Sequence, residues 1–173
     1  EAVLVNVLGT KNLAKLSSKY KVNRFVMVST DKAVNPTNVM GASKKLMEQV
    51  VMAYSHKLAI TTARFANVAF SNGSLPAGFL ERIQKRQPLS APSDVLRYFV
   101  SAEEAGELCL LACMLGESGE VFFPKFDPEH DVKRFSDIAV DLLQALGFQA
   151  SSVLTRGGTE AAGEYWRGMV PRS

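Results

Sequence analysis

The chain has 173 residues, of which 47% are hydrophobic, and a formal net charge of +3. This length allows one ordinary domain with a sizeable core, and the composition is typical of a soluble globular protein. The mild charge argues against nucleic acid as a partner, and no apolar run reaches the roughly 18 residues that a membrane span needs.

The N-terminal segment, residues 1–20, has the loose periodicity of an amphipathic helix. Its apolar face is expected to contain Val3, Val7, Leu13 and Leu16. Residues 24–28 are apolar and β-branched, apart from the first, and predict a strand buried on both faces. In open α/β sheets, ligands bind beyond the carboxyl ends of the strands, so a site is expected where this strand ends.

Four polar residues stand at that end: Ser29, Thr30, Asp31 and Lys32. A string of this kind often forms only a capping turn with solvated charges. Here it follows a buried strand and precedes a helix, which favours an active site.

The following helix is expected over residues 37–56, and Pro36 suits its start because proline lacks the N–H that a first turn cannot pair. Its core face is expected to contain Leu46, Val50, Val51 and Tyr54. Met40 and Lys44 are four residues apart, so they share one helix face and can point back at the strand end.

The later elements alternate between helix and strand, which predicts an α/β fold with strands 24–29 and 59–66 parallel in one sheet. They are expected in this order: a strand over 59–66, a turn over 71–74, a helix over 75–86, a loop between Pro88 and Pro92, a strand over 96–100, a helix over 102–115, a strand over 119–124, a loop over 126–131, a helix over 135–146 that ends at Gly147, and an irregular tail over 149–173.

Cys109 and Cys113 lie four residues apart in an apolar helix and are expected to be buried thiols, which favours a reducing, cytoplasmic setting. The acidic loop that carries Asp127, Glu129, His130 and Asp131 matches neither an EF-hand nor a zinc pattern. We therefore expect it to be a solvated loop, and we expect no metal site.

The segment VSTDKAVNPTNVMGASKK, residues 28–45, resembles the active-site segment of the extended short-chain dehydrogenase/reductases. It is most similar to the nucleotide-sugar 4,6-dehydratases that act on UDP-N-acetylglucosamine, and the resemblance covers residues 1–140. In that family a Ser or Thr ends a central strand, an Asp-Lys pair follows, and a Tyr-x-x-x-Lys helix comes next. Met40 replaces the Tyr here, as it does in some membrane-anchored members.

The resemblance implies part of a Rossmann-like doubly wound parallel sheet, with a small substrate-binding α/β portion. The implied division is 1–70 for the second half of the Rossmann-like domain, 71–148 for the substrate portion and 149–173 for the tail. The chain has no initiator Met and no glycine-rich phosphate turn, so it is expected to be the C-terminal part of a longer enzyme whose N-terminal half is absent. A complete small protein is the alternative.

The resemblance also implies roles in catalysis. Asp31 would protonate the leaving C6 hydroxyl, Lys32 would take the C5 proton, and Thr30 would hydrogen-bond the oxygen on C4. Met40 cannot move a proton, because a thioether has none to give.

For the ligands, the resemblance assigns Lys44 to the ribose of NAD or NADP, with Ser29 beside the cofactor. The nucleotide diphosphate of a UDP-sugar would contact Asn67 and Arg97, since the planar fork of an arginine fits a diphosphate. Arg64 and Ser74 are weaker candidates, and the position of Arg64 within a strand allows a structural role instead.

The implied function is an NAD(P)-dependent nucleotide-sugar 4,6-dehydratase for surface polysaccharide or glycan biosynthesis. We expect a cytoplasmic homo-oligomer, with the parent enzyme attached to the inner face of the membrane as one option. A nucleotide-sugar 4-epimerase or reductase of the same fold is one alternative, which the Asp31–Lys32 pair opposes because epimerisation needs no C5 base. A non-catalytic remnant that binds a partner subunit is another, favoured by Met40 and by the missing phosphate turn.

We expect the 173-residue chain alone to bind neither NAD nor NADP with useful affinity, because it holds no glycine-rich turn for the pyrophosphate. Titration calorimetry is the measurement. A micromolar dissociation constant for either dinucleotide would contradict this expectation.

Overall fold

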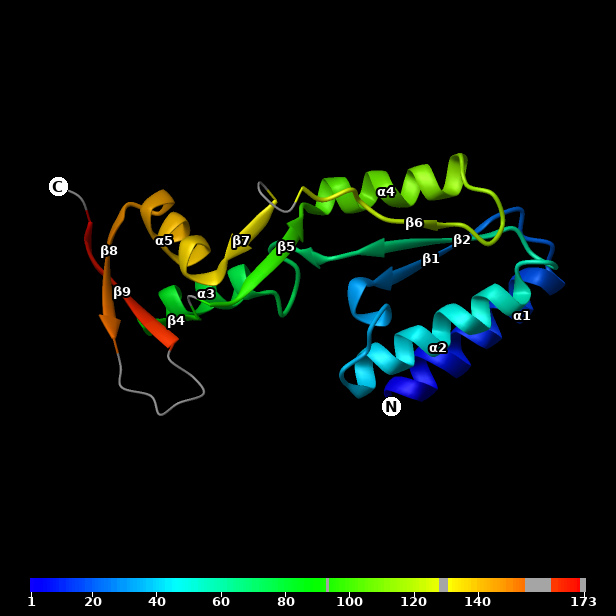
Figure 1. The fold of residues 1–173 in the computed structure, drawn as a ribbon, viewed down its shortest axis with the longest axis horizontal. Coiled ribbons are helices and arrows are strands. Elements are labelled where there is room, and N and C mark those ends of the chain that lie inside the picture. The colour runs from blue at the N-terminus through cyan, green and yellow to red at the C-terminus, as the bar shows by residue number, and fades with distance from the viewer. Residues whose placement is uncertain (93, 128–130, 155–162, 172–173) are drawn as a thin grey trace. The chain divides into compact units, whose positions relative to one another are not determined.

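The computed structural model describes residues 1–92, 94–127, 131–154 and 163–171 (Figure 1). The chain forms two compact units, each built from two separate segments: Glu1–Ala66 with Ala102–Lys125, and Asn67–Ser101 with Phe126–Ser173. This division differs from the expected boundaries after residues 70 and 148. The reason is that the helix after residue 101 packs on the strands of the first unit.

The first unit contains a three-stranded sheet and the helices around it. In chain order its elements are a π-helical turn η1 (Leu4–Gly9), α1 (Thr10–Lys19), β1 (Phe25–Thr30), a 3-10 turn η2 (Asp31–Ala33), α2 (Val39–Tyr54), β2 (Ile60–Phe65), α4 (Ala102–Met114) and β6 (Val121–Phe122).

The sheet has the strand order β1-β2-β6, and both pairings are parallel. The register of the first pair runs from Phe25 opposite Ile60 to Thr30 opposite Phe65, so both strands end at the same edge. Helix α2 covers one face of the sheet and α4 covers the other (Figure 1). The predicted parallel α/β arrangement is therefore confirmed.

Side chains of β1, α2 and β2 form the core between α2 and the sheet. Its buried members are Met27, Met47, Val51, Leu58 and Ile60, with Phe25 and Tyr54 packed against them. The predicted core face of α2 is wrong at Leu46, which is 46% exposed. The buried positions are Gly41, Ser43, Met47 and Val51. The last three are spaced four apart along the helix, and Leu46 does not lie on the face that they form.

The N-terminal helix also differs from its expectation. It begins with a π-helical turn, and Val3, Leu13 and Leu16 are exposed. Ala14 is its fully buried residue, because α1 packs on α2 through a small side chain that allows the two helices to approach closely.

Helix α2 begins at Val39 rather than next to Pro36. Its cap is Asn38, whose side-chain oxygen accepts a hydrogen bond from the Gly41 amide at 2.9 Å. A Cβ on Gly41 would lie 2.6 Å from the carbonyl oxygen of Lys32. The missing side chain thus lets the first turn of α2 rest directly on the backbone of η2.

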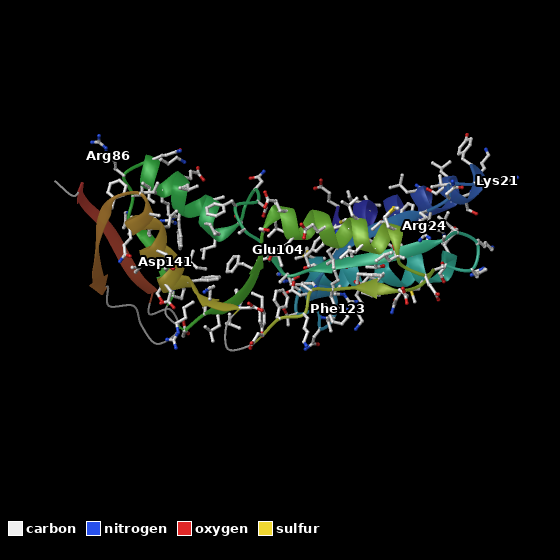
Figure 2. The ribbon with its side chains drawn as sticks, turned by 90° about the horizontal axis from the view of Figure 1, so that it is seen from above. Lys21, Arg24, Arg86, Glu104, Phe123 and Asp141 are labelled. Atoms are coloured by element: carbon white, nitrogen blue, oxygen red, sulfur yellow. The ribbon has the colours of Figure 1, made fainter. Side chains whose placement is uncertain are left out.

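Two hydrogen bonds attach α4 to the sheet. The guanidinium of Arg24, labelled in Figure 2, donates to the carbonyl of Gly116 at 2.8 Å. The hydroxyl of Thr61 donates to the carbonyl of Ala112 at 2.9 Å. The Ala112 carbonyl belongs to the last turn of α4 and has no partner within the helix, whereas Gly116 lies two residues beyond the end of α4.

The second unit contains short strands and two helices. In chain order its elements are β3 (Asn67–Val68), α3 (Leu75–Gln84), β4 (Leu89–Pro92), β5 (Leu96–Val100), β7 (Val132–Arg134), α5 (Phe135–Ala145), β8 (Phe148–Leu154) and β9 (Gly163–Pro171). One sheet has the order β3-β5-β7 and the other has the order β4-β9-β8.

Two predictions for this unit are wrong. The segment between Pro88 and Pro92 was expected to be a loop, and it forms β4, because it pairs antiparallel with β9 and buries Leu89 and Ala91. The tail was expected to be irregular, and residues 148–154 and 163–171 form the β8–β9 hairpin. The expected helix end is confirmed at Gly147, whose φ of +80° suits glycine.

The core of the second unit lies between α3, α5 and β4. Its buried members are Phe79, Leu89, Ala91, Ala139 and Leu143. Each unit therefore has its own hydrophobic cluster, one between α2 and the strands β1 and β2, and one among α3, α5 and β4.

The cysteines of α4 are free, half-buried thiols, and burial raises the pKa of the Cys109 thiol. None of the helices in the described part of the chain has the length and apolar character needed to cross a bilayer.

Met47→Ala should lower the free energy of unfolding by about 2–5 kcal/mol, because it removes a buried side chain and leaves a cavity. Leu46→Ala, one position earlier on the same helix, should change it by less than about 0.5 kcal/mol. Urea denaturation measures both. Equal losses in the two variants would show that Leu46 is in the core after all.

Gly41→Ala should destabilise the first unit by about 1–3 kcal/mol, because the new methyl group overlaps the Lys32 carbonyl. The matched control is Gly78→Ala in α3, where a Cβ has no neighbour within 4 Å. That helical substitution should stabilise by about 0.5–1 kcal/mol. Thermal unfolding followed by circular dichroism measures both changes, and stabilisation by Gly41→Ala would contradict the close approach of α2.

Candidate functional site

The polar residues at the end of β1 form a short chain of hydrogen bonds. Thr30 is the last residue of the strand, and its hydroxyl donates to Oδ1 of Asp31 at 2.9 Å. The ammonium of Lys32 donates to the same oxygen at 2.7 Å. Thr30 also caps the η2 turn, because its hydroxyl accepts a hydrogen bond from the Lys32 amide at 3.4 Å.

This cluster is open to solvent. The side chains of Asp31 and Lys32 are 48% and 39% exposed. Ion pairs at this level of exposure add little to stability.

Ser29 lies next to this cluster on the inner side of the sheet. It is 5% exposed, and its hydroxyl has no hydrogen-bond partner among the residues that the structure describes. Buried hydroxyls without a partner are rare in folded proteins. The hydroxyl is therefore a position where a bound molecule can add a hydrogen bond.

Met40 and Lys44 lie on the first turns of α2, as predicted. The side chain of Met40 is 42% exposed. Lys44 is half-buried, its ammonium lies 4.0 Å from the sulfur of Met47, and it makes no ion pair within the described part of the chain. Lys45 points elsewhere, since its ammonium donates to the carbonyl of Val34 at 3.4 Å.

Sequence reasoning missed a polar link between η1 and α2. The side-chain amide of Asn6 donates to the hydroxyl of Ser43 at 2.9 Å, and that hydroxyl donates to the carbonyl of Met40 at 2.8 Å. Ser43 is fully buried, which explains why a polar residue stands on the inner face of α2. A small polar residue within an otherwise apolar helix face was the available signal.

Arg64 has a partner that the sequence analysis did not identify. Its guanidinium forms a two-pronged ion pair with Glu48 of α2, with Nε–Oε1 at 3.2 Å and an outer nitrogen–Oε2 distance of 2.8 Å. The two side chains are 23% and 15% exposed. They border an open pocket of about 420 Å³ that is also lined by Ala33, Val34, Lys45, Gln49 and Met52. The structure thus gives Arg64 a structural partner.

The remaining predicted residues lie in the second unit. The side-chain amide of Asn67 donates to the carbonyl of Tyr98 at 2.9 Å. Arg97 is exposed, its guanidinium donates to the carbonyl of Leu96, and it lies 5.8 Å from the centre of the Phe135 ring. Ser74 caps α3, since its hydroxyl accepts from the Ala77 amide at 3.4 Å.

The structure therefore brings Thr30, Asp31 and Lys32 into direct contact in the first unit. It places Asn67, Arg97 and Ser74 in the second unit. In the acidic loop, Asp127 and Asp131 hydrogen-bond each other's backbone, whereas Glu129 and His130 lie outside the described residues. The described residues contain no group of three or more side chains arranged to hold a metal ion.

Known proteins resemble this chain over most of its length. The capsular polysaccharide biosynthesis protein CapD of Staphylococcus aureus is 40% identical over 151 residues, which are 85% of this chain and 25% of that protein. The UDP-glucose 4-epimerase of Rickettsia canadensis is 36% identical over 132 residues, 72% of this chain and 38% of the epimerase. The chain thus spans well under half of the length of either relative.

A solved structure shares the fold. It is the dTDP-glucose 4,6-dehydratase of Bacillus anthracis in complex with NAD, which aligns with a TM-score of 0.72 and 19% identity over 84% of this chain and 53% of that one. Residues 1–161 match the family described as polysaccharide biosynthesis protein. The chain belongs to this family, with the α/β fold of the extended short-chain dehydrogenase/reductases.

Proposed function

We propose that this chain is the catalytic and substrate-binding portion of an NAD(P)-dependent nucleotide-sugar 4,6-dehydratase of the UDP-N-acetylglucosamine type. The observation that carries the proposal is the hydrogen-bonded set Thr30, Asp31 and Lys32 at the carboxyl end of a parallel strand. That edge is where α/β sheets bind their ligands. An acid and a base in contact at this edge suit an elimination, in which one proton is removed and another is delivered.

The elimination needs a neutral amine and a neutral carboxylic acid. Asp31 gains the proton that it delivers when it takes the proton of the 4-hydroxyl in the preceding oxidation step. Lys32 then takes the proton from C5 of the sugar, and Asp31 protonates the C6 hydroxyl as it leaves. Thr30 holds the oxygen on C4. Oxidation of C4 to a ketone makes the C5 proton acidic enough to remove.

The residues around β1 fit a nicotinamide dinucleotide. The buried Ser29 hydroxyl has no partner among the described residues, and Lys44 carries an ammonium without an ion pair there. Ser29 and Lys44 would contact the nicotinamide end, with Lys44 on the ribose hydroxyls. NAD or NADP would accept the C4 hydride and return it to C6.

Binding of the UDP-sugar is assigned to the second unit. Arg97 has an exposed guanidinium with free directions toward solvent, which suits a diphosphate. Asn67 and Ser74 already make intramolecular hydrogen bonds, so each would contact the nucleotide with its remaining acceptor or donor capacity. Arg64 is not among the proposed substrate contacts, because its guanidinium already forms an ion pair with the Glu48 carboxylate.

Met40 leaves the first step without its usual proton acceptor. A thioether cannot take the proton of the 4-hydroxyl, so another group must do so. Asp31 is a carboxylate already hydrogen-bonded to Thr30, which makes it the nearest acceptor along the cluster. A water held between Thr30 and Lys44 is the other route.

An epimerase is the second candidate, and the 36% identity to the Rickettsia canadensis UDP-glucose 4-epimerase favours it. An epimerase removes and returns the hydride at C4 and needs no acid–base pair at C5 and C6. The two activities differ in their product, which is a 4-keto-6-deoxy sugar in one case and a C4 epimer in the other.

Lys32→Ala, in a full-length enzyme that carries this segment, should abolish exchange of the C5 hydrogen with solvent deuterium while sugar binding is nearly retained. The reason is that the variant loses the C5 base but keeps Thr30 and the diphosphate contacts. Mass spectrometry of the recovered nucleotide sugar measures the exchange. The control is Lys45→Ala, whose ammonium contacts the Val34 carbonyl.

If the Lys32→Ala variant still exchanges the C5 hydrogen at the unmodified rate, Lys32 is not the base that removes the C5 proton. A C4 epimer as the product of the unmodified enzyme would replace the dehydratase proposal with the epimerase.

A further inference from the structure

The fork between Arg64 and Glu48 lies beside the candidate site. Arg64 stands opposite Ser29 in the register of β1 and β2, one residue before the ends of both strands. Its two contacts with Glu48, at 3.2 and 2.8 Å, use both carboxylate oxygens. The carboxylate is therefore held toward β2 rather than along its own helix.

Glu48 is also four residues after Lys44 on α2. Side chains at this spacing are neighbours on a helix surface, so an opposite-charge pair there is able to form an ion pair. In this structure the pair is not formed, and the ammonium of Lys44 has a 4.0 Å contact with the sulfur of Met47 instead. The carboxylate that would hold Lys44 is already occupied by Arg64.

We propose that Arg64 is a positioning residue that binds Glu48 and so keeps the ammonium of Lys44 out of an ion pair within its own helix. The fork also attaches α2 to β2, and its two side chains are 23% and 15% exposed. The arrangement of Arg64, Glu48 and Lys44 is independent of the proposed function. Its consequence for cofactor binding rests on the role proposed for Lys44.

A second lysine makes the proposal specific. Lys45 is three residues before Glu48 and lines the same pocket as the fork. Its ammonium is bound to the Val34 carbonyl at 3.4 Å, and its side chain is exposed. Glu48 is mostly buried, so once it is released by Arg64 we expect it to pair with the half-buried Lys44 rather than with Lys45.

The test measures the reactivity of single lysines in the 173-residue chain. Acetic anhydride is the probe, mass spectrometry locates the acetylated residue, and exposed Lys57 is the internal reference. An ammonium held by a carboxylate reacts more slowly, because its charged form is favoured. The variants are Arg64→Met, Glu48→Gln and the double variant Arg64→Met/Glu48→Gln, each checked for folding by circular dichroism.

Arg64→Met should slow the acetylation of Lys44 relative to Lys57 by about two- to fivefold, the effect of a partly exposed ion pair. Glu48→Gln should not slow it, and the double variant should return it to the wild-type rate, because no carboxylate remains to hold the lysine. A role as a simple attachment predicts instead that all three variants behave alike, since each breaks the fork.

Three outcomes would overturn the proposal: an unchanged Lys44 rate in Arg64→Met, an equal change in all three variants, or slowing at Lys45 in place of Lys44. If Arg64→Met does not fold, Arg64→Lys takes its place. A single ammonium binds the carboxylate less completely than a fork, so a partial slowing that Glu48→Gln removes is expected, and no slowing would refute the proposal. None of these outcomes bears on whether the enzyme is a dehydratase.

Discussion

The parallel pairing of β1 with β2 is the constraint on which the first unit depends. Its register runs through six consecutive residue pairs, from Phe25–Ile60 to Thr30–Phe65, so both strands end at one edge. That edge presents the hydroxyl of Thr30 and the charged side chains of Asp31 and Lys32 in η2. It also sets Arg64 beside Ser29, on the face that α2 covers. A slip of one residue would turn each of these side chains to the opposite face of the sheet.

Helix α2 is held by contacts with three different elements along its length: η2, η1 and β2. Gly41 rests on the Lys32 backbone, Ser43 is tied to Asn6, and Glu48 is tied to Arg64. The first contact depends on a missing side chain, the second on a neutral hydrogen bond and the third on charge. Met40 directly precedes the first of these contacts and Lys44 lies between the second and the third, so their backbone positions are fixed although their side chains remain partly exposed.

Local patterns in the sequence predicted most elements of the fold, including the parallel strands and the polar cluster after β1. They failed where an element depends on a distant partner. Pro88 and Pro92 border the segment that forms β4, and prolines at such positions are typical of a loop. The segment is a strand because β9 pairs with it. Leu46 and Met47 are adjacent and equally apolar, so the burial of one rather than the other depends on the rotation of α2. The partner of Arg64 was missed for the same reason, since 16 residues separate it from Glu48.

Each unit is built from two segments, and the first unit lacks α4 and β6 until residue 125 has been added. During synthesis, β1 and β2 emerge from the ribosome before the helix that covers their second face. The apolar surface of this sheet is thus uncovered while the next 35 residues, Asn67–Ser101, are translated. At about 5–20 residues per second, this interval lasts a few seconds, during which a chaperone that binds exposed strands has its best opportunity to act.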